Sequence, residues 1–216
     1  MNQIAFGALK AVTPVGPTNQ RALAKQRTRE KILAAAAELF AARGYEGATI
    51  RDIAKAAGMS TGAVFASFTD KSDLFGEIVA QEHQALQGAL RAAAAEKSGF
   101  AAVIAMLDAA AERHLADLAL FQATQSAIWT PGLGTDVRRR VGQRPVAALI
   151  AGALKGELGC GEAGGNLVAE LIWDSYTATL RRAALEGLSL EVVKARVREQ
   201  VGLILAGAKR QGGTAT

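Results

Sequence analysis

Apolar residues recur at helical spacing along most of this chain, and that period constrains its fold more than any other feature. The first clear stripe has the i, i+1, i+4, i+7, i+8 pattern of an amphipathic helix and consists of Ile32, Leu33, Ala36, Leu39 and Phe40. Similar stripes lie within residues 103–110, 167–180 and 193–205. Because no segment alternates apolar and polar residues between hairpin turns, the sequence predicts an all-α fold.

Capping residues and glycines divide the amino-terminal part of the chain into short helices. Thr49 followed by Asp52 has the capping-box spacing, which predicts that a helix starts there. The other predicted start and stop residues are Gly44, Gly58, Ser60, Asp70 and Asp73. A series of short helices is therefore expected before residue 76.

These patterns divide the chain into regions. The predicted regions are a disordered arm (1–26), a helix-turn-helix domain (27–75), a larger helical domain (76–210) and a disordered tail (211–216). The arm is expected because turn-forming residues cluster within Thr13–Asn19, without a helical period. Pro145 falls inside the helical pattern of residues 137–154, so it either kinks that helix or marks its start.

Basic residues are concentrated toward the amino terminus. The chain has a net charge of +5, and residues 1–75 contain ten basic and six acidic side chains. The remaining residues contain 15 basic and 14 acidic side chains, so they are nearly neutral. A basic segment on a neutral body is typical of a protein that binds a polyanion such as nucleic acid. A solvated basic face without a partner would have the same composition.

The sequence also disfavours several classes of protein. The single cysteine, Cys160, argues against a disulfide framework and indicates a reducing compartment. The two histidines, His83 and His114, have no carboxylate at metal-ligand spacing, so neither a metal site nor a cofactor is expected. The best apolar run, residues 146–154, is too short to cross a membrane. The protein is expected to be soluble and cytoplasmic.

The segment Thr49–Phe68 has the pattern of a helix, a glycine turn and a second helix. In this geometry the second helix enters the major groove of DNA while the first crosses the backbone. The run from Arg29 to Leu74 resembles the amino-terminal domain of the TetR family of transcriptional regulators, including the connection Gly44–Thr49 and the closing segment Phe68–Leu74. The resemblance implies that residues 76–210 form a helical domain for ligand binding and dimerisation.

The resemblance also implies a set of DNA-contacting residues. They are Arg27, Thr49, Arg51, Ser60, Thr61, Gly62, Ala63, Phe65, Ser67 and Lys71. Arg51 is the only long donor near the start of the second helix that can reach a guanine edge in a bidentate manner. Gly62 lets the backbone approach closely, and Ala63 can meet a thymine methyl group. For Arg51 and Lys71 the alternative is a solvated side chain without a partner.

The second helix of this motif departs from the pattern that is usual in the family. Phe65 stands where a tyrosine hydroxyl usually meets a phosphate, and the residues after it are smaller than usual. Because this helix is poor in base-reading groups, we expect specificity to depend on Arg51, a thymine methyl contact and DNA shape. Arg21 and Lys25 in the arm either contact phosphates or the minor groove, or belong to a solvated tail.

The larger domain is expected to bind a small molecule and to dimerise. The candidate ligand-binding residues are Met106, His114, Phe121, Trp129 and Trp173. The last two apolar stripes, within residues 167–185 and 190–206, contain small residues that permit close approach of helices. By resemblance these two long helices form a four-helix dimer interface. An intramolecular hairpin would bury the same surface.

Together these features predict a homodimeric transcriptional repressor that a small-molecule effector releases from a palindromic DNA operator. Its two recognition helices would lie about 34–36 Å apart, one turn of DNA or slightly more. The repressor assignment is what the resemblance implies. The alternative is an architectural DNA-binding protein without an effector, acting through charge and DNA shape. No nucleophile can be paired with a base in the sequence, so an enzyme is not expected.

Overall fold

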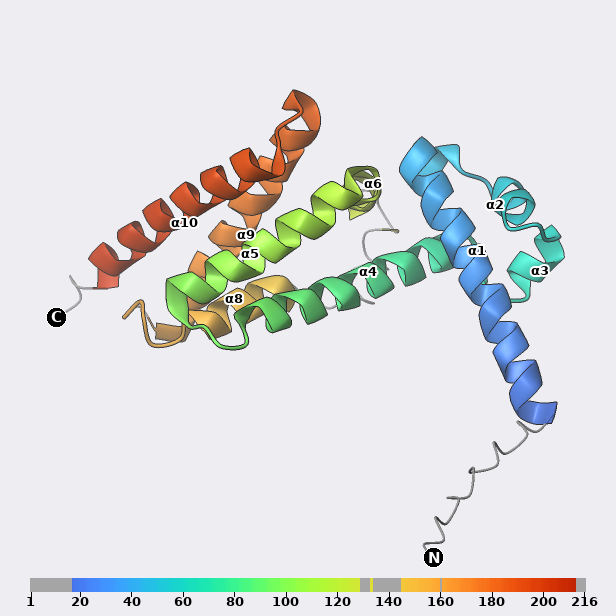
Figure 1. Cartoon of the computed structure of the whole chain (residues 1–216), viewed down its shortest axis with the longest axis horizontal. Coiled ribbons are helices and arrows are strands. Elements are labelled where there is room, and N and C mark those ends of the chain that lie inside the picture. The colour runs from blue at the N-terminus through green and yellow to red at the C-terminus, as the bar shows by residue number, and fades with distance from the viewer. Residues whose placement is uncertain (1–16, 129–132, 134–144, 160, 213–216) are drawn as a thin grey trace, which may run out of the picture.

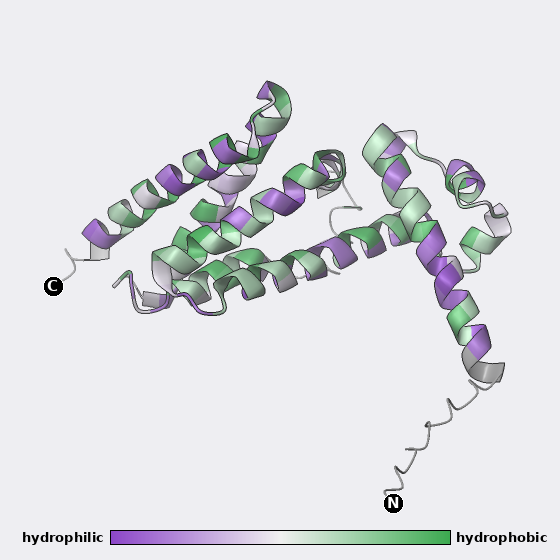
Figure 2. Cartoon of the chain, in the orientation of Figure 1, coloured by the Kyte–Doolittle hydropathy of each residue, from purple (hydrophilic) through white to green (hydrophobic). Residues whose placement is uncertain are grey.

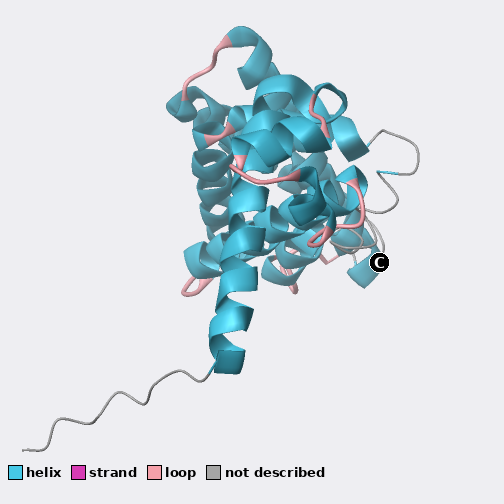
Figure 3. Cartoon of the chain, turned by 90° about the vertical axis from the view of Figure 1, so that its right-hand side faces the viewer, coloured by secondary structure: helices cyan, strands magenta, loops and turns pink. Residues whose placement is uncertain are grey.

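The computed structural model describes residues 17–128, 133, 145–159 and 161–212, which are helical apart from turns and short connections (Figure 1). The helices are α1 (Pro17–Gly47), α2 (Ile50–Ala56), α3 (Thr61–Phe65), α4 (Lys71–Ala94), α5 (Gly99–Ala116), α6 (Leu118–Ile128), α8 (Pro145–Ala153), α9 (Gly161–Glu186) and α10 (Leu190–Gly212). Figure 3 shows helices and loops but no strand in the described part of the chain. The predicted all-α fold is confirmed. Among the described residues, no helix is both long and apolar enough to cross a membrane.

The predicted capping residues start the helices that they were expected to start. The Thr49 hydroxyl accepts a hydrogen bond from the Asp52 amide at 3.2 Å, so α2 begins there. Ser60 accepts from the Ala63 amide at 3.2 Å, and Asp70 accepts from the Asp73 amide at 2.8 Å. These bonds satisfy backbone donors that have no partner within the first turn of a helix.

Glycine and proline also act at the positions that the sequence indicated. Gly44 has a φ of 71°, which breaks the helical geometry of α1 three residues before its end. Gly58 follows α2 with a φ of 67°. Both conformations are costly for a residue with a Cβ atom. Pro145 is the first residue of α8, so it marks a helix start, and proline suits that position because it has no amide to donate.

The predicted arm and tail are partly wrong. Residues 17–26 are helical and form the beginning of α1, and α10 continues to Gly212. Pro17 suits the first turn of a helix, and the alanine, arginine, lysine and glutamine residues after it have high helix propensity. Because turn-forming residues cluster just before this segment, the sequence predicted disorder there and not a helix. The rest of the predicted arm, residues 1–16, and residues 213–216 lie outside the described residues.

The described chain has two hydrophobic cores. The first belongs to the head, which we define as α1 to α3 with the start of α4, and it is built around Ile32, Phe40, Ile53, Val64 and Phe75. The rings of Phe40 and Phe75 meet edge to face with centroids 5.0 Å apart. The second core belongs to the body, which is the rest of α4 with α5 to α10, and it includes Leu90, Leu107, Ile150, Ile172 and Val197.

Helix α4 belongs to both parts of the molecule. Its residues Leu74 and Phe75 lie in the head core, whereas Leu86 and Leu90 lie in the body core. The boundary predicted between residues 75 and 76 therefore falls inside one continuous helix. Helix α6 also bridges the two parts, because it packs against α1 and contributes to each core. The head is thus attached to the body by packed helices rather than by a linker.

We predict that Gly99→Ala destabilises the protein by about 1–2 kcal/mol, because Gly99 has a φ of +55° at the start of α5. A Cβ atom at this position would also overlap the carboxylate of Glu157. Gly88→Ala is the matched control: Gly88 lies inside α4 with open space where the Cβ would be, so this change should stabilise by about 0.5–1 kcal/mol. Urea unfolding measures the change in unfolding free energy in both variants. Equal changes in the two variants would contradict the prediction.

Candidate nucleic-acid interface and ligand pocket

Most of the predicted DNA-contacting residues in and around α2 and α3 are exposed on the head. The exposed ones are Thr49, Arg51, Ser60, Thr61, Gly62 and Phe65, and the partly buried ones are Ala63 and Ser67. Val64 of the same short helix is fully buried in the head core and fixes the orientation of α3. The Phe65 side chain is 55% exposed, which is unusual for a phenylalanine and leaves an apolar group free for contact.

Arg51 is exposed near the start of α2 and has no ion pair with any described residue. The neighbouring acid, Asp52, is engaged by the Thr49 hydroxyl at 2.7 Å and by Arg43 at 3.7 Å. The hydrogen bond from Thr49 is the main cause that lowers the pKa of Asp52. Because Asp52 is bound to these groups, the Arg51 guanidinium is available for an external acceptor.

Arg29 fastens the recognition helix α3 to α1 and α4. Its guanidinium donates to the Ser67 carbonyl oxygen at 2.7 Å and lies 4.1 Å from the centre of the Phe68 ring. It also lies 3.3 Å from the Glu77 carboxylate of α4. One side chain of α1 therefore joins the connection that follows α3 to helix α4. The sequence placed Arg29 within the family motif but did not reveal this role.

Lys71 has a similar role at the start of α4. Its ammonium donates to the Tyr45 carbonyl oxygen at 2.9 Å and lies 4.2 Å from the centre of the Tyr45 ring. The Glu46 carboxylate is 3.8 Å away. Lys71 was predicted to contact DNA, and in this structure its partly buried ammonium joins α4 to the end of α1. Arg27, also predicted to contact DNA, is exposed on α1.

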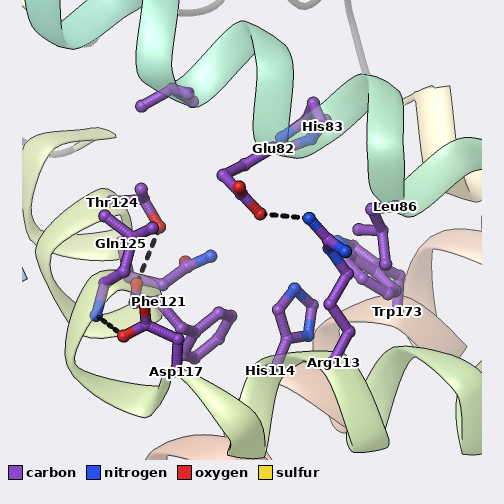
Figure 4. Close-up of a pocket in the computed structure, with 12 residues that line it drawn as sticks. Glu82, His83, Leu86, Arg113, His114, Asp117, Phe121, Thr124, Gln125 and Trp173 are labelled. Atoms are coloured by element: carbon purple, nitrogen blue, oxygen red, sulfur yellow. Dashed lines mark hydrogen bonds and ion pairs between the residues drawn. The ribbon is translucent and has the colours of Figure 1, made fainter. Parts of the chain in front are cut away.

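A pocket lies between α4, α5, α6 and α9, next to the head (Figure 4). Three of the predicted ligand-binding residues, His114, Phe121 and Trp173, line it. Met106 does not line it, because its side chain packs in the body core and is only 5% exposed. Trp129 lies outside the described residues. The pocket residues that the sequence did not reveal are Val79, Glu82, His83, Leu86, Arg113, Asp117, Leu120, Thr124 and Gln125.

The pocket is organised by two pairs of side chains. An ion pair of 2.6 Å joins Arg113 of α5 to Glu82 of α4. The next residue of α5 forms the second pair, since His114 Nδ1 lies 2.7 Å from the hydroxyl oxygen of Tyr176 on α9. The His114 ring also packs against Phe121, with centroids 4.6 Å apart, and Trp173 stacks on Tyr176 at 4.9 Å. The pocket therefore combines aromatic walls with charged and hydrogen-bonding groups.

Comparison with known proteins identifies the head. Residues 32–78 match the family model of bacterial regulatory proteins of the tetR family. The amino-terminal domain belongs to the TetR family. The regulator AcrR of Shigella flexneri is 49% identical over 53 residues, which are 24% of this chain and 25% of that protein. The repressor AcnR of Corynebacterium glutamicum is 50% identical over 48 residues, which are 22% of this chain and 26% of that protein.

These relatives match the TetR-type head, so the matched part spans about a quarter of their length. The body is similar to solved structures. A structure of the transcriptional regulator FadR from Bacillus subtilis, in complex with stearoyl-CoA, superposes with a TM-score of 0.71 at 19% identity. The likeness covers 82% of this chain and 98% of that one. At this identity it shows the fold alone, namely a TetR-type head followed by a helical body.

The two histidines of the chain meet at this pocket although they are far apart in sequence. Burial, with smaller effects of His83 and Arg113, lowers the pKa of His114 to about 4. Burial also lowers the pKa of His83. Both rings are therefore neutral near pH 7. Within the part of the chain that the structure describes, no group of three or more His, Cys, Asp or Glu side chains is arranged to hold a metal ion, and Cys160 lies outside that part.

We predict that His114 makes stability depend on pH. The unfolded protein protonates this histidine near pH 6.5, whereas the folded protein does so only near pH 4, so the unfolded state binds more protons between these values. Lowering the pH through this window should cost up to about 3 kcal/mol of unfolding free energy. His114→Asn keeps a polar group beside Tyr176 and should flatten the curve. Urea unfolding at several pH values measures the unfolding free energy of the wild type and of this variant. If both depend on pH in the same way, the assignment to His114 is wrong.

Proposed function

We propose that this chain is a DNA-binding transcriptional regulator, acting as a homodimeric repressor that a small molecule releases from a palindromic operator. The observation that carries the proposal is the course of α4. This helix begins in the head, where Lys71 anchors it to the end of α1, and it continues to the pocket residues Glu82 and His83. A TetR-type head and a pocket in the body therefore share one rigid element.

The exposed groups of the head favour recognition of base edges by a small number of contacts. Arg51 is the long donor that can bind a guanine edge with two hydrogen bonds. Phe65 and Ala63 present apolar surface on α3, which suits the methyl group of thymine. Since the remaining side chains of α3 are short, we infer that DNA shape supplies part of the specificity.

The packing of α4 and α6 supports a link between the pocket and the head. Leu120 of α6 lies in the head core, and the next residue, Phe121, lies in the body core; both line the pocket. Val79 of α4 also lies in the head core and lines the pocket. A ligand that separates α4 from α6 would therefore shift residues that pack directly on the head. Such a ligand would favour a head orientation that no longer fits the operator.

The pocket favours a small ligand with polar groups. Its volume is about 60 Å³, which is space for a few water molecules. The stearoyl-CoA that the FadR structure holds is far larger than this space. We infer that this chain either binds a smaller molecule or opens the pocket on binding. His114, Arg113 and Gln125 offer hydrogen-bonding groups, and Phe121 and Trp173 offer aromatic walls.

The outer surface of α9 and α10 supports dimerisation. Its exposed large apolar side chains include Leu167, Leu171, Val192 and Leu203. The inner faces of the two helices already pack on each other and on the body core through residues such as Leu180 and Val197. The outer leucines are therefore additional to the intramolecular packing, as expected for a surface that a second copy covers.

We predict that Arg51→Ala weakens binding to the cognate operator by about 1–3 kcal/mol and changes binding to random DNA much less. The expected loss reflects two hydrogen bonds to a guanine. Fluorescence anisotropy at fixed salt measures both affinities, with the DNA flanking the protein's own gene as the first operator candidate. An equal loss on operator and random DNA would assign Arg51 to phosphate contact instead.

The same measurement on the wild type separates the two functional hypotheses. Preference for an operator over shuffled DNA by roughly a thousandfold or more is expected for a sequence-reading regulator. Equal binding to all DNA, with a steep dependence on salt, would favour the architectural alternative.

We predict that the double variant Leu171→Lys/Leu203→Lys is monomeric, because two charges then lie on an interface that must exclude water. The replaced leucines are 50% and 69% exposed, so the fold of each protomer should remain. Leu23→Lys is the matched control, since Leu23 is 41% exposed on α1, away from the body. Sedimentation equilibrium should give the monomer mass for the double variant and the dimer mass for both the wild type and Leu23→Lys. An unchanged mass would place the dimer interface elsewhere.

A further inference from the structure

The amino-terminal part of α1 extends well beyond the other helices of the head (Figures 1 and 3). This projecting part is largely hydrophilic (Figure 2). It carries Arg21, Lys25 and Arg27, all exposed, and no acidic residue before Glu30. Neither Arg21 nor Lys25 has an ion pair with a described residue. The projection is therefore a basic helix without a partner in the rest of the described chain.

Two of these cations lie in register with Arg29. Arg21, Lys25 and Arg29 follow one another at intervals of four residues, so they form one row along α1 with steps of about 6 Å. The position of Arg29 is fixed, because its guanidinium binds the carbonyl oxygen of Ser67, two residues after the recognition helix α3. The row therefore leads from the connection after α3 outward along the projecting helix. Arg27 lies on a different face of α1.

We propose that Arg21 and Lys25 bind the phosphate backbone of double-stranded DNA beside the segment that the recognition helix reads. This inference rests on the proposed DNA-binding function. It is carried by charge complementarity and by continuity with the recognition surface, since Arg29 joins the row to α3. Each strand of the duplex carries one phosphate for about every 3.4 Å of helix axis, so two cations about 6 Å apart can each reach a phosphate.

The composition of the projection favours DNA over a membrane surface. A helix that lies on a membrane needs a broad apolar face opposite its basic residues. Here the one large apolar side chain between Arg21 and Thr28 is Leu23, and its other apolar neighbours are alanines. The row thus supplies charge with little apolar area to insert, which is the requirement for phosphate contact.

The experiment compares Arg21→Ala/Lys25→Ala with the wild-type full-length chain, by fluorescence anisotropy on operator DNA and on shuffled DNA over a range of salt. Alanine preserves the helix, and circular dichroism checks this. We expect affinity to fall by about tenfold at 0.1 M salt on both DNAs. The slope of log K against log salt should fall by about 1.8, which is about 0.9 for each of the two phosphates that the variant no longer neutralises.

Arg91→Ala/Lys97→Ala is the charge-matched control, because it removes two exposed cations near the far end of α4. This control should leave the salt slope unchanged. An equal effect of both double variants would mean that net charge alone is responsible, and it would overturn the proposal. If the wild type binds its operator and Arg21→Ala/Lys25→Ala binds equally well, the proposal is overturned too. If the wild type bound no DNA, the proposed function itself would fail, and this inference with it.

Discussion

The burial of α4 in two hydrophobic cores is the constraint on which the rest of the structure depends. Leu74 and Phe75 are fully buried on the head side, and Leu90 is fully buried on the body side. Full burial of one such side chain is worth about 1.5–3 kcal/mol, so neither end of the helix detaches at an accessible cost. The head can therefore change its orientation only together with α4. This coupling makes a pocket beside α4 relevant to DNA binding.

Two cations join α4 to the rest of the head. Arg29 of α1 binds the connection after α3 and lies beside Glu77 of α4, and Lys71 links the first turn of α4 to the end of α1. Each combines a backbone carbonyl, a carboxylate and an aromatic ring, so several weak contacts hold one side chain in a single place. The unit of α1, α3 and α4 is therefore held together by polar contacts around its core. A shift of α4 would therefore move the proposed DNA-contacting surface as a whole.

The sequence predicted the parts of this molecule that depend on local rules. The caps at Thr49 and Ser60 were found because a cap and its partner lie three residues apart. The pocket was found only in part, because its pairs join distant residues: His114 and Tyr176 are 62 positions apart, and Arg113 and Glu82 are 31 positions apart. Met106 packs in the body core and not at this pocket, and the sequence did not distinguish the two, because a helical stripe shows which residues are apolar but not which neighbour they face.

The ion pair between Arg113 and Glu82 determines how a ligand in the pocket would act on α4. It joins α5 to α4 across the pocket at 2.6 Å. Both side chains are more than a third exposed, so water screens the pair, and separating the two charges costs only about 0–1 kcal/mol. Under the proposed function, a ligand that carries its own anionic or hydrogen-bonding group replaces one partner and frees the other helix. Because the pair is weak, this exchange needs little binding energy, and it is the step that would loosen α4 from α5.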